Sequence, residues 1–146
     1  MSSINKICLI TPPSPFLLDE RVLMHIGILK VAAALEERGY LVDFLDLAGV
    51  ENCNEVLDTY LNQNPSIKTF GLTATTPQIP FAFKISQYLR EFCPESKIIL
   101  GGTHSSLMHS AMKKEKTPGR ATKDIQALLE NFDVVVSRCG LVPLQY

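Results

Sequence analysis

Short apolar runs alternate with longer amphipathic stretches along this chain, which is the pattern of βαβ units around a parallel sheet. Five of the apolar runs predict strands, at residues 7–10, 41–47, 69–73, 98–100 and 132–136. Residues 98–100 and 134–136 are unbroken aliphatic triplets, which are typical of central parallel strands covered on both faces. The strand pattern therefore favours a parallel sheet over an antiparallel one.

Between these strands, apolar residues recur at helical spacing and predict helices at 21–38, 51–63, 75–92 and 123–131. Gly39 follows the first helix and can adopt the left-handed backbone conformation that ends a helix. Pro77 lies in the first turn of the third helix, where a backbone N–H would have no partner within the helix. The alternation predicts an α/β fold of the flavodoxin-like (Rossmann-like) kind. We expect a doubly wound, five-stranded parallel sheet with helices on both faces.

Residues 112–122, between the fourth and fifth strands, are polar and basic. We interpret them as an exposed excursion before the last helix. A polybasic binding site is the alternative, but a solvated loop is favoured because Glu115 and its surroundings dilute the positive charge.

Composition narrows the class of protein further. The chain has 146 residues, enough for one domain with its own core, and a net charge of −1, which argues against nucleic acid or an anionic membrane surface as a partner. No apolar run approaches the roughly 20 residues of a membrane span, and the polar N-terminus does not read as a signal peptide. The four cysteines are scattered without a Cys-x-x-Cys pair, so we expect a reduced, cytoplasmic protein.

The candidate binding residues are those that follow each strand, because open parallel sheets bind ligands at the carboxyl ends of their strands. The residues at those ends are mostly small or carry hydroxyl groups, which lets a large ligand approach the backbone. They are Thr11, Pro12, Pro13, Thr73, Ala74, Thr75, Thr76, Gly101, Gly102, Thr103, His104 and Ser137. His104 fits a helix cap and a ligand contact equally well, whereas His109, one turn later, reads as a surface residue.

Five segments in order carry a family resemblance: Ile-Cys-Leu-Ile-Thr-Pro-Pro at 7–13, the apolar stretch at 26–35 ending at Gly39, Val-Asp-Phe-Leu-Asp at 42–46, Phe-Gly-Leu-Thr-Ala-Thr-Thr-Pro at 70–77, and Ile-Ile-Leu-Gly-Gly-Thr-His at 98–104. Together they resemble the cobalamin-binding domain at the N-terminus of class B radical-SAM proteins. The likeness runs from about Lys6 to Val136, and the ordered set carries it, since no single segment is specific.

The resemblance implies a corrinoid-binding module with cobalamin as its cofactor. Thr73 and Thr75 would hydrogen-bond the cofactor's nucleotide tail, Gly101 and Gly102 would leave room for it, and Thr103 and His104 would flank the corrin. The remaining residues at the strand ends, with His25 and Gly27 near the pocket mouth, would complete the cofactor site. A catalytic residue is not expected.

Two departures from related domains matter. Methionine-synthase-like domains carry Asp-x-His-x-x-Gly, whose imidazole binds cobalt and is oriented by the aspartate. This sequence has no Asp-x-His. The nearest candidate is His25, but Asp19 upstream and Gly27 downstream fit neither the Asp-to-His nor the His-to-Gly spacing of that motif. We therefore expect base-off cobalamin without a protein imidazole on cobalt. The radical-SAM relatives commonly lack this ligand too.

The second departure is that residues 141–146 do not continue into a radical-SAM barrel with its Cys-x-x-x-Cys-x-x-Cys signature. We therefore expect a cobalamin-binding-like domain at 1–140 and a non-family tail at 141–146. The chain would be a truncated product or a stand-alone binder, inactive alone, with a radical-SAM or methyltransferase domain acting in trans.

Other functions fit less well. The Gly-x-Gly-x-x-Gly turn of NAD sites, the acidic cluster of response regulators and the nucleophile elbow of hydrolases are all missing. Asp43 and Asp46 lie three apart on one strand and would point to opposite faces, which disfavours a carboxylate dyad. The main alternative is a degenerate domain of the same fold that binds no corrin and acts through self-association, as a homo-oligomer.

Overall fold

The computed structural model describes residues 5–15, 25–138 and 140–142. Six strands form one sheet in the order β2-β1-β3-β4-β5-β6. The first five are parallel, and the two-residue β6 pairs antiparallel with β5. The strands are β1 (Lys6–Thr11), β2 (Leu41–Asp46), β3 (Thr69–Thr73), β4 (Lys97–Gly101), β5 (Val134–Ser137) and β6 (Gly140–Leu141). This order confirms the predicted flavodoxin-like sheet, and it places the switch point between β1 and β3.

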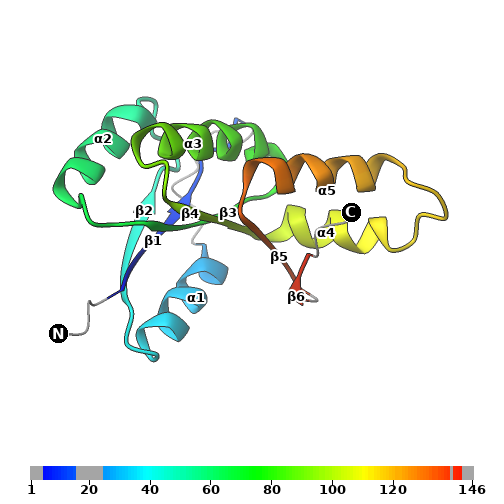
Figure 1. Cartoon of the computed structure of the whole chain (residues 1–146), viewed down its shortest axis with the longest axis horizontal. Coiled ribbons are helices and arrows are strands. Elements are labelled where there is room, and N and C mark those ends of the chain that lie inside the picture. Colours follow the sequence, from blue (N-terminus) through cyan, green and yellow to red (C-terminus); the bar gives the residue numbers. More distant parts are fainter. Residues whose placement is uncertain (1–4, 16–24, 139, 143–146) are drawn as a thin grey trace.

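Helices cover both faces of the sheet, although unevenly. Figure 1 shows α2, α3 and α5 on one side and α1 on the other, whereas α4 and α5 lie side by side and project past the β5 edge. The helices are α1 (Ile26–Glu36), α2 (Cys53–Gln63), the 3-10 turn η2 (Thr76–Gln78), α3 (Ile79–Phe92), α4 (Thr103–Met112) and α5 (Arg120–Asn131). None of the helices in the described ranges is both long and apolar enough to cross a bilayer.

The hydrophobic core lies between the sheet and the side covered by α2, α3 and α5. Phe70, Ile98 and Leu100 of the central strands are fully buried there. Leu61 of α2 and Leu89 of α3 belong to the same cluster of buried side chains. Because strand residues alternate between faces, Leu9, Gly71 and Ile99 lie on the opposite face of the sheet, on the side of α1.

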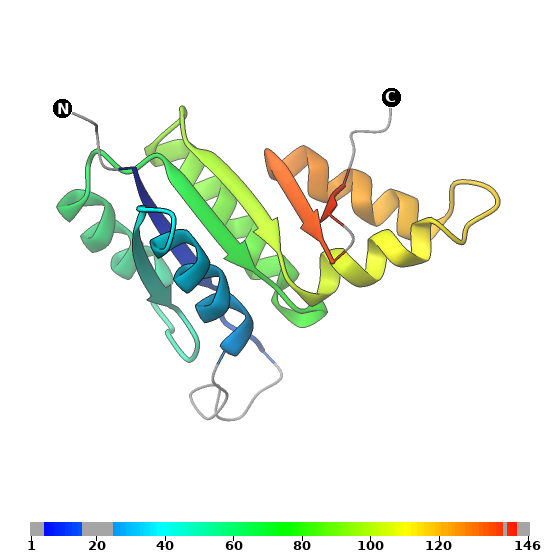
Figure 2. The same cartoon turned by 90° about the horizontal axis from the view of Figure 1, so that it is seen from below.

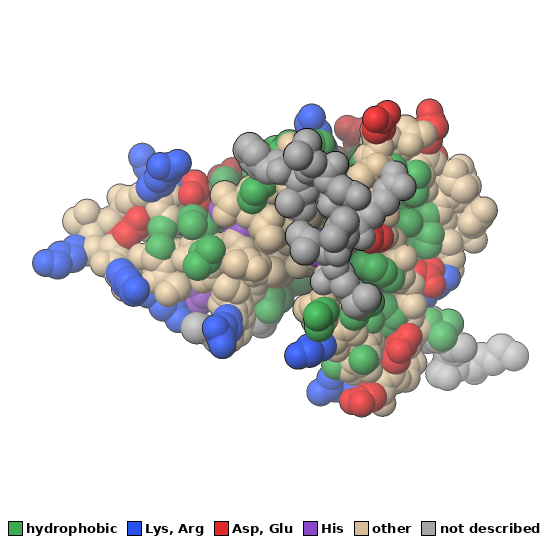
Figure 3. All heavy atoms as spheres, turned by 180° about the vertical axis from the view of Figure 1, so that it is seen from behind, with side chains coloured by type: hydrophobic (Ala, Val, Ile, Leu, Met, Phe, Trp, Pro, Cys, Tyr) green, Lys and Arg blue, Asp and Glu red, His purple; other side chains and the backbone are tan. Residues whose placement is uncertain are grey.

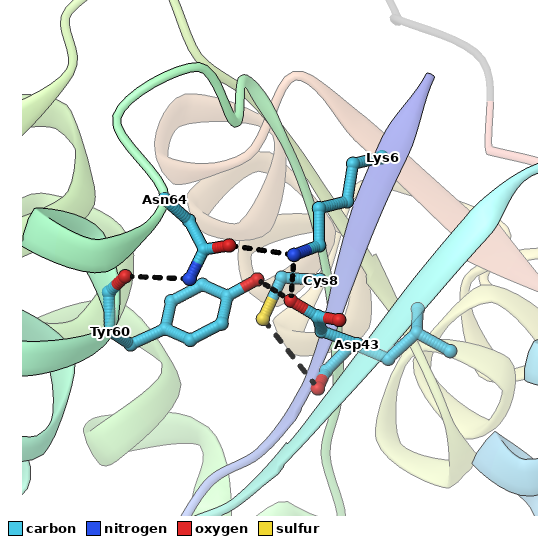
Figure 4. Close-up of polar contacts among 6 residues, drawn as sticks. Lys6, Cys8, Asp43, Tyr60 and Asn64 are labelled. Atoms are coloured by element: carbon cyan, nitrogen blue, oxygen red, sulfur yellow. Dashed lines mark hydrogen bonds and ion pairs between the residues drawn. The ribbon is translucent and has the colours of Figure 1, made fainter. Parts of the chain in front are cut away.

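A polar cluster beneath this core ties β1 and β2 to α2 (Figure 4). The Lys6 ammonium lies 2.7 Å from an Asp43 carboxylate oxygen, and the Tyr60 hydroxyl donates to the same oxygen at 2.6 Å. Burial alone would raise the pKa of Asp43, but the hydrogen bonds from Lys6 and Tyr60 bring it below its ordinary value. Burial of Cys8 beside this cluster raises the pKa of its thiol to about 12. The cluster fixes the edge strand β2 to the sheet.

The first and the last helix begin at other residues than predicted. The first helix begins at Ile26, with His25 just before it, and residues 21–24 of the predicted helix lie outside the described residues. The last helix begins at Arg120, so the loop predicted to reach Thr122 is wrong at its end. The cause is Glu115, whose carboxylate accepts from the N–H groups of Gly119, Ala121 and Thr122 and from the Thr122 hydroxyl. A carboxylate from the preceding loop thus satisfies the free amides at the helix start.

Candidate cofactor site at the carboxyl edge

Three small residues lie level with one another at the carboxyl ends of neighbouring strands. Ile10 pairs with Leu72, so Thr11 of β1 is level with Thr73 of β3, and Thr73 pairs with Gly101 of β4. Ile10 and Leu72 belong to the core, and the alternation of strand side chains therefore turns this row towards the face that carries α1. We call Thr11, Thr73 and Gly101 the threonine–glycine row.

Space is available along the row. A Cβ atom built on Gly101 would meet nothing within 4 Å. One step back on the same face, a Cβ on Gly71 would come within 2.8 Å of a Leu9 methyl group, so the Leu9 side chain would have to shift to admit a larger residue. Open space therefore lies beside Gly101, at the β4 end of the row.

Thr11 carries an unsatisfied group in this row. Its side chain is completely buried, and its hydroxyl has no hydrogen-bond partner among the described residues. Leaving a buried hydroxyl unpaired is unfavourable, and such groups are rare in native proteins unless a ligand or water completes them. The residues of the row thus fit a bound molecule that supplies a polar atom at the end of β1.

Gly102 has a structural role beside the row. Its φ is +103°, and a Cβ there would come within 2.7 Å of the Ala74 nitrogen and 2.8 Å of the Thr73 hydroxyl oxygen. Only glycine allows this approach, which brings the His104 N–H to the Ala74 carbonyl at 3.1 Å. The loops after β3 and β4 are therefore joined at the backbone.

Gln78 joins the loops on either side of the switch point, and the sequence prediction missed it. Its side chain is buried; the amide nitrogen donates to the Pro12 carbonyl at 2.7 Å, and the amide oxygen accepts from the Thr75 N–H at 2.9 Å and its hydroxyl at 3.0 Å. The Thr-x-x-Gln spacing of a capping box was a signal for the Thr75 contact. Nothing local indicates the contact with Pro12, 66 residues away.

The two buried histidines hold α4 in place. His104 is buried, and its Nδ1 lies 3.0 Å from the Thr76 hydroxyl; its side chain does not cap α4 as the sequence suggested it could. The prediction that His109 is a surface residue is wrong, because its ring is buried and its Nδ1 lies 2.7 Å from the Ser137 hydroxyl. Burial lowers the pKa of both rings, with Lys113 adding to the effect at His109.

The other predicted site residues surround the row at varying distances from it. Pro12 and Pro13 are buried in the loop after β1, whereas Thr75, Thr76 and Thr103 are exposed near the start of α3 and α4. Gly27 is exposed on α1, and His25 is half-buried just before that helix. In the described ranges, no group of three or more His, Cys, Asp and Glu residues could hold a metal ion.

A separate hollow of about 330 Å³ opens on the other face, between the start of α2 and the first turns of α3. Pro13 is the only predicted site residue among those that line it. The threonine–glycine row, rather than this hollow, holds three of the predicted site residues: Thr11, Thr73 and Gly101.

Comparison with known proteins identifies the family. The B12 binding domain family matches residues 20–136 of the chain. This chain belongs to the B12 binding domain family. Its cofactor is therefore cobalamin, which confirms the cofactor implied by the resemblance of the sequence to such domains.

Two solved structures share the fold of this B12 binding domain. One is the radical S-adenosylmethionine methyltransferase TsrM from Kitasatospora setae with tryptophan substrate and a SAM analog, at 17% identity and a TM-score of 0.62. The other is TsrM with cobalamin and a [4Fe-4S] cluster bound, at 18% identity and a TM-score of 0.55. Each match covers 96% of this chain but only 30% of TsrM. No curated protein matches the sequence.

Proposed function

We propose that this domain holds cobalamin at the carboxyl edge of its sheet, with part of the cofactor lying along the threonine–glycine row. The observation that carries the proposal is the buried Thr11 hydroxyl without a partner, on the face where Gly101 leaves open space. A polar atom of the cofactor would complete the hydrogen bonding of Thr11, and the Thr73 hydroxyl would offer a second contact. Gly101 would provide the room.

The surrounding residues would shape and hold this slot. Gln78 fixes the loop that contains Pro12 and Pro13, and Gly102 allows the loop after β4 to meet Ala74. The loop residues Thr75, Thr76 and Thr103 would border the corrin together with His104, while Ser137, His25 and Gly27 would lie at the periphery. Preorganised loops of this kind reduce the conformational entropy lost on binding.

We further propose that the cofactor is bound base-off and without a protein imidazole on cobalt. A metal-bound imidazole is usually oriented by a carboxylate or carbonyl that accepts its second N–H. Within the described part of the chain, the His25 ring has no hydrogen-bond partner, and the Asp-x-His pattern is absent from the sequence. His104 and His109 are both held by hydroxyl groups of the domain itself.

The chemistry would be completed by another domain. Bound cobalamin supplies methyl-transfer or radical chemistry, and the domain's own residues bind and orient it. Because the chain spans only about 30% of TsrM, any radical-SAM or methyltransferase activity belongs to a partner domain that works with this one.

The test is a visible-absorbance titration of the purified chain with hydroxocobalamin and methylcobalamin. We expect saturable binding with a shift towards the base-off spectrum. Gly101→Leu fills the open space without backbone strain and should weaken binding by roughly a hundredfold, since it excludes the cofactor sterically. Thr69→Leu, at the other end of β3, is the matched control and should bind normally. An unaffected Gly101→Leu variant would contradict the proposed position.

A second function, self-association without a corrin, is favoured by one observation. Ile26, Leu29 and Val31 on α1 are 58%, 39% and 50% exposed, which gives this helix an uncovered apolar surface. If the chain took up no cobalamin and sedimented as a dimer, self-association would replace cofactor binding as the leading function.

A further inference from the structure

The hairpin of α4 and α5 projects beyond the β5 edge and ends in a strongly basic tip (Figures 1 and 2). Residues 113–123, which form this tip, are called the basic arm. Five of them are exposed cations, and they form no salt bridge with any residue in the described ranges. They are Lys113, Lys114, Lys116, Arg120 and Lys123. Figure 3 shows Lys and Arg side chains gathered at this end of the molecule and acidic ones mainly at the other.

The single carboxylate within the arm, Glu115, is half-exposed and bound to the start of α5. Glu115 accepts hydrogen bonds from Gly119, Ala121 and Thr122, and these bonds lower its pKa to about 2. Its negative charge therefore lies against the start of α5. The five exposed cations outnumber this one carboxylate, so the arm keeps a net charge of +4.

Helix stability does not account for all of these cations. Lys113 follows the last residue of α4, where a positive charge interacts favourably with the helix dipole. Arg120 and Lys123 instead lie in the first turns of α5, where a positive charge opposes the dipole. Two exposed cations therefore lie where they interact unfavourably with the helix dipole. Their presence is better explained by binding to another molecule than by helix stability.

We propose that the basic arm is a docking surface for an acidic face of a protein partner. α4 begins directly after Gly102 and runs to the arm, so a protein held by the arm would lie about 15 Å, the length of this helix, from the end of β4. The loop is fixed by Glu115, so little ordering would be needed on docking. The proposal does not depend on cobalamin binding.

An acidic protein fits better than a nucleic acid. Residues 113–123 carry five cations and one carboxylate, a net charge of +4, so the rest of the chain, with −1 in total, carries −5. Nucleic-acid sites spread positive charge along a face that follows the phosphates, whereas this charge sits on one tip of an otherwise acidic domain and matches a single acidic patch.

The test measures binding to immobilised poly-L-glutamate, with single-stranded oligo-dT and phosphatidylserine vesicles as competing classes of anion. Lys114→Glu with Lys116→Glu reverses two of the five positive charges and takes the arm from +4 to 0, and Arg38→Glu with Lys97→Glu makes the same net change at exposed positions elsewhere. We expect the arm variant to bind poly-L-glutamate roughly tenfold more weakly, because like charges now face the ligand, while the control variant binds as the wild type does. Cobalamin binding and circular dichroism should be unchanged in both.

Equal losses in the two variants would overturn the proposal, because net charge rather than the arm would then govern binding. Wild-type binding by the arm variant would also overturn it. Tighter binding to oligo-dT or to vesicles than to poly-L-glutamate would assign the arm to a nucleic acid or a lipid surface instead.

Discussion

The side chain of Gln78 donates a hydrogen bond to the carbonyl oxygen of Pro12, 2.7 Å away and on the other side of the switch point. Pro12 and Pro13 lack backbone N–H groups, so the loop after β1 has few means of fixing itself. Gln78 supplies the missing donor, and its oxygen is already engaged by Thr75. The separation of the two loops beside the threonine–glycine row therefore depends on one buried amide.

Gln78→Glu should destabilise the fold and weaken cobalamin binding. The carboxylate keeps an acceptor for Thr75 but places a negative oxygen against the Pro12 carbonyl. Because a buried polar pair is broken, we expect a loss of about 1–3 kcal/mol in the free energy of unfolding, measured by urea denaturation. Gln87→Glu, on an exposed position of α3, is the control. Equal stability of the two variants would show that Gln78 does not hold the loop.

Glu115 should make stability depend on pH in the acid range. Its pKa is lowered from 4.5 to about 2 in the folded state by hydrogen bonds from Thr122, Ala121 and Gly119. The stabilisation is therefore complete above pH 4.5 and is lost as the pH falls towards 2. Urea midpoints measured between pH 6 and pH 3 should fall less steeply for Glu115→Gln than for the wild type. A Glu130→Gln control should follow the wild type; identical slopes for Glu115→Gln would refute the capping role.

His25→Ala should leave the spectrum of bound cobalamin unchanged. The proposed site places no imidazole on cobalt, so removing this ring changes no metal ligand. Absorbance spectra and electron paramagnetic resonance of the cob(II)alamin form would report a nitrogen ligand directly. Loss of a nitrogen hyperfine signal in the variant would establish His25 as the cobalt ligand and contradict base-off binding without protein ligation.

Cys8 should resist alkylation in the native protein. Its side chain is completely buried, and a thiol pKa of about 12 leaves almost no thiolate at neutral pH. Mass spectrometry after brief iodoacetamide treatment should find Cys93, which is half-buried, modified long before Cys8. Comparable rates for the two thiols would mean that the cluster around Asp43 and Tyr60 opens readily.

The strands were predictable because their apolar runs are continuous and bounded by proline, glycine or polar residues, and the third strand was predicted at its observed bounds. The start of α5 was not, because its cap comes from Glu115 in the preceding loop. The burial of His109 was missed for a similar reason. Its immediate neighbours, Met108 and Ser110, do not indicate burial, while its partner, Ser137, lies on β5.

The candidate site was predictable as a set of positions but not as a geometry. The order of strands and glycines was enough to predict a cofactor edge that includes Thr73 and Gly101. That Thr11 is level with them, buried and without a partner, follows only from strand register and packing. Gln78 depends on a contact between distant segments, which no local pattern encodes.

The most direct test of the account compares Thr11→Val with Ser96→Ala, because both side chains carry buried hydroxyls that have no partner in the described part of the chain, and only Thr11 lies at the proposed site. Each substitution removes an unsatisfied group and should stabilise the free domain by about 1 kcal/mol. Cobalamin affinity should fall roughly tenfold in Thr11→Val, through loss of a hydrogen bond, and stay unchanged in Ser96→Ala. A stabilised Thr11→Val variant that binds cobalamin as tightly as the wild type would contradict the proposed site.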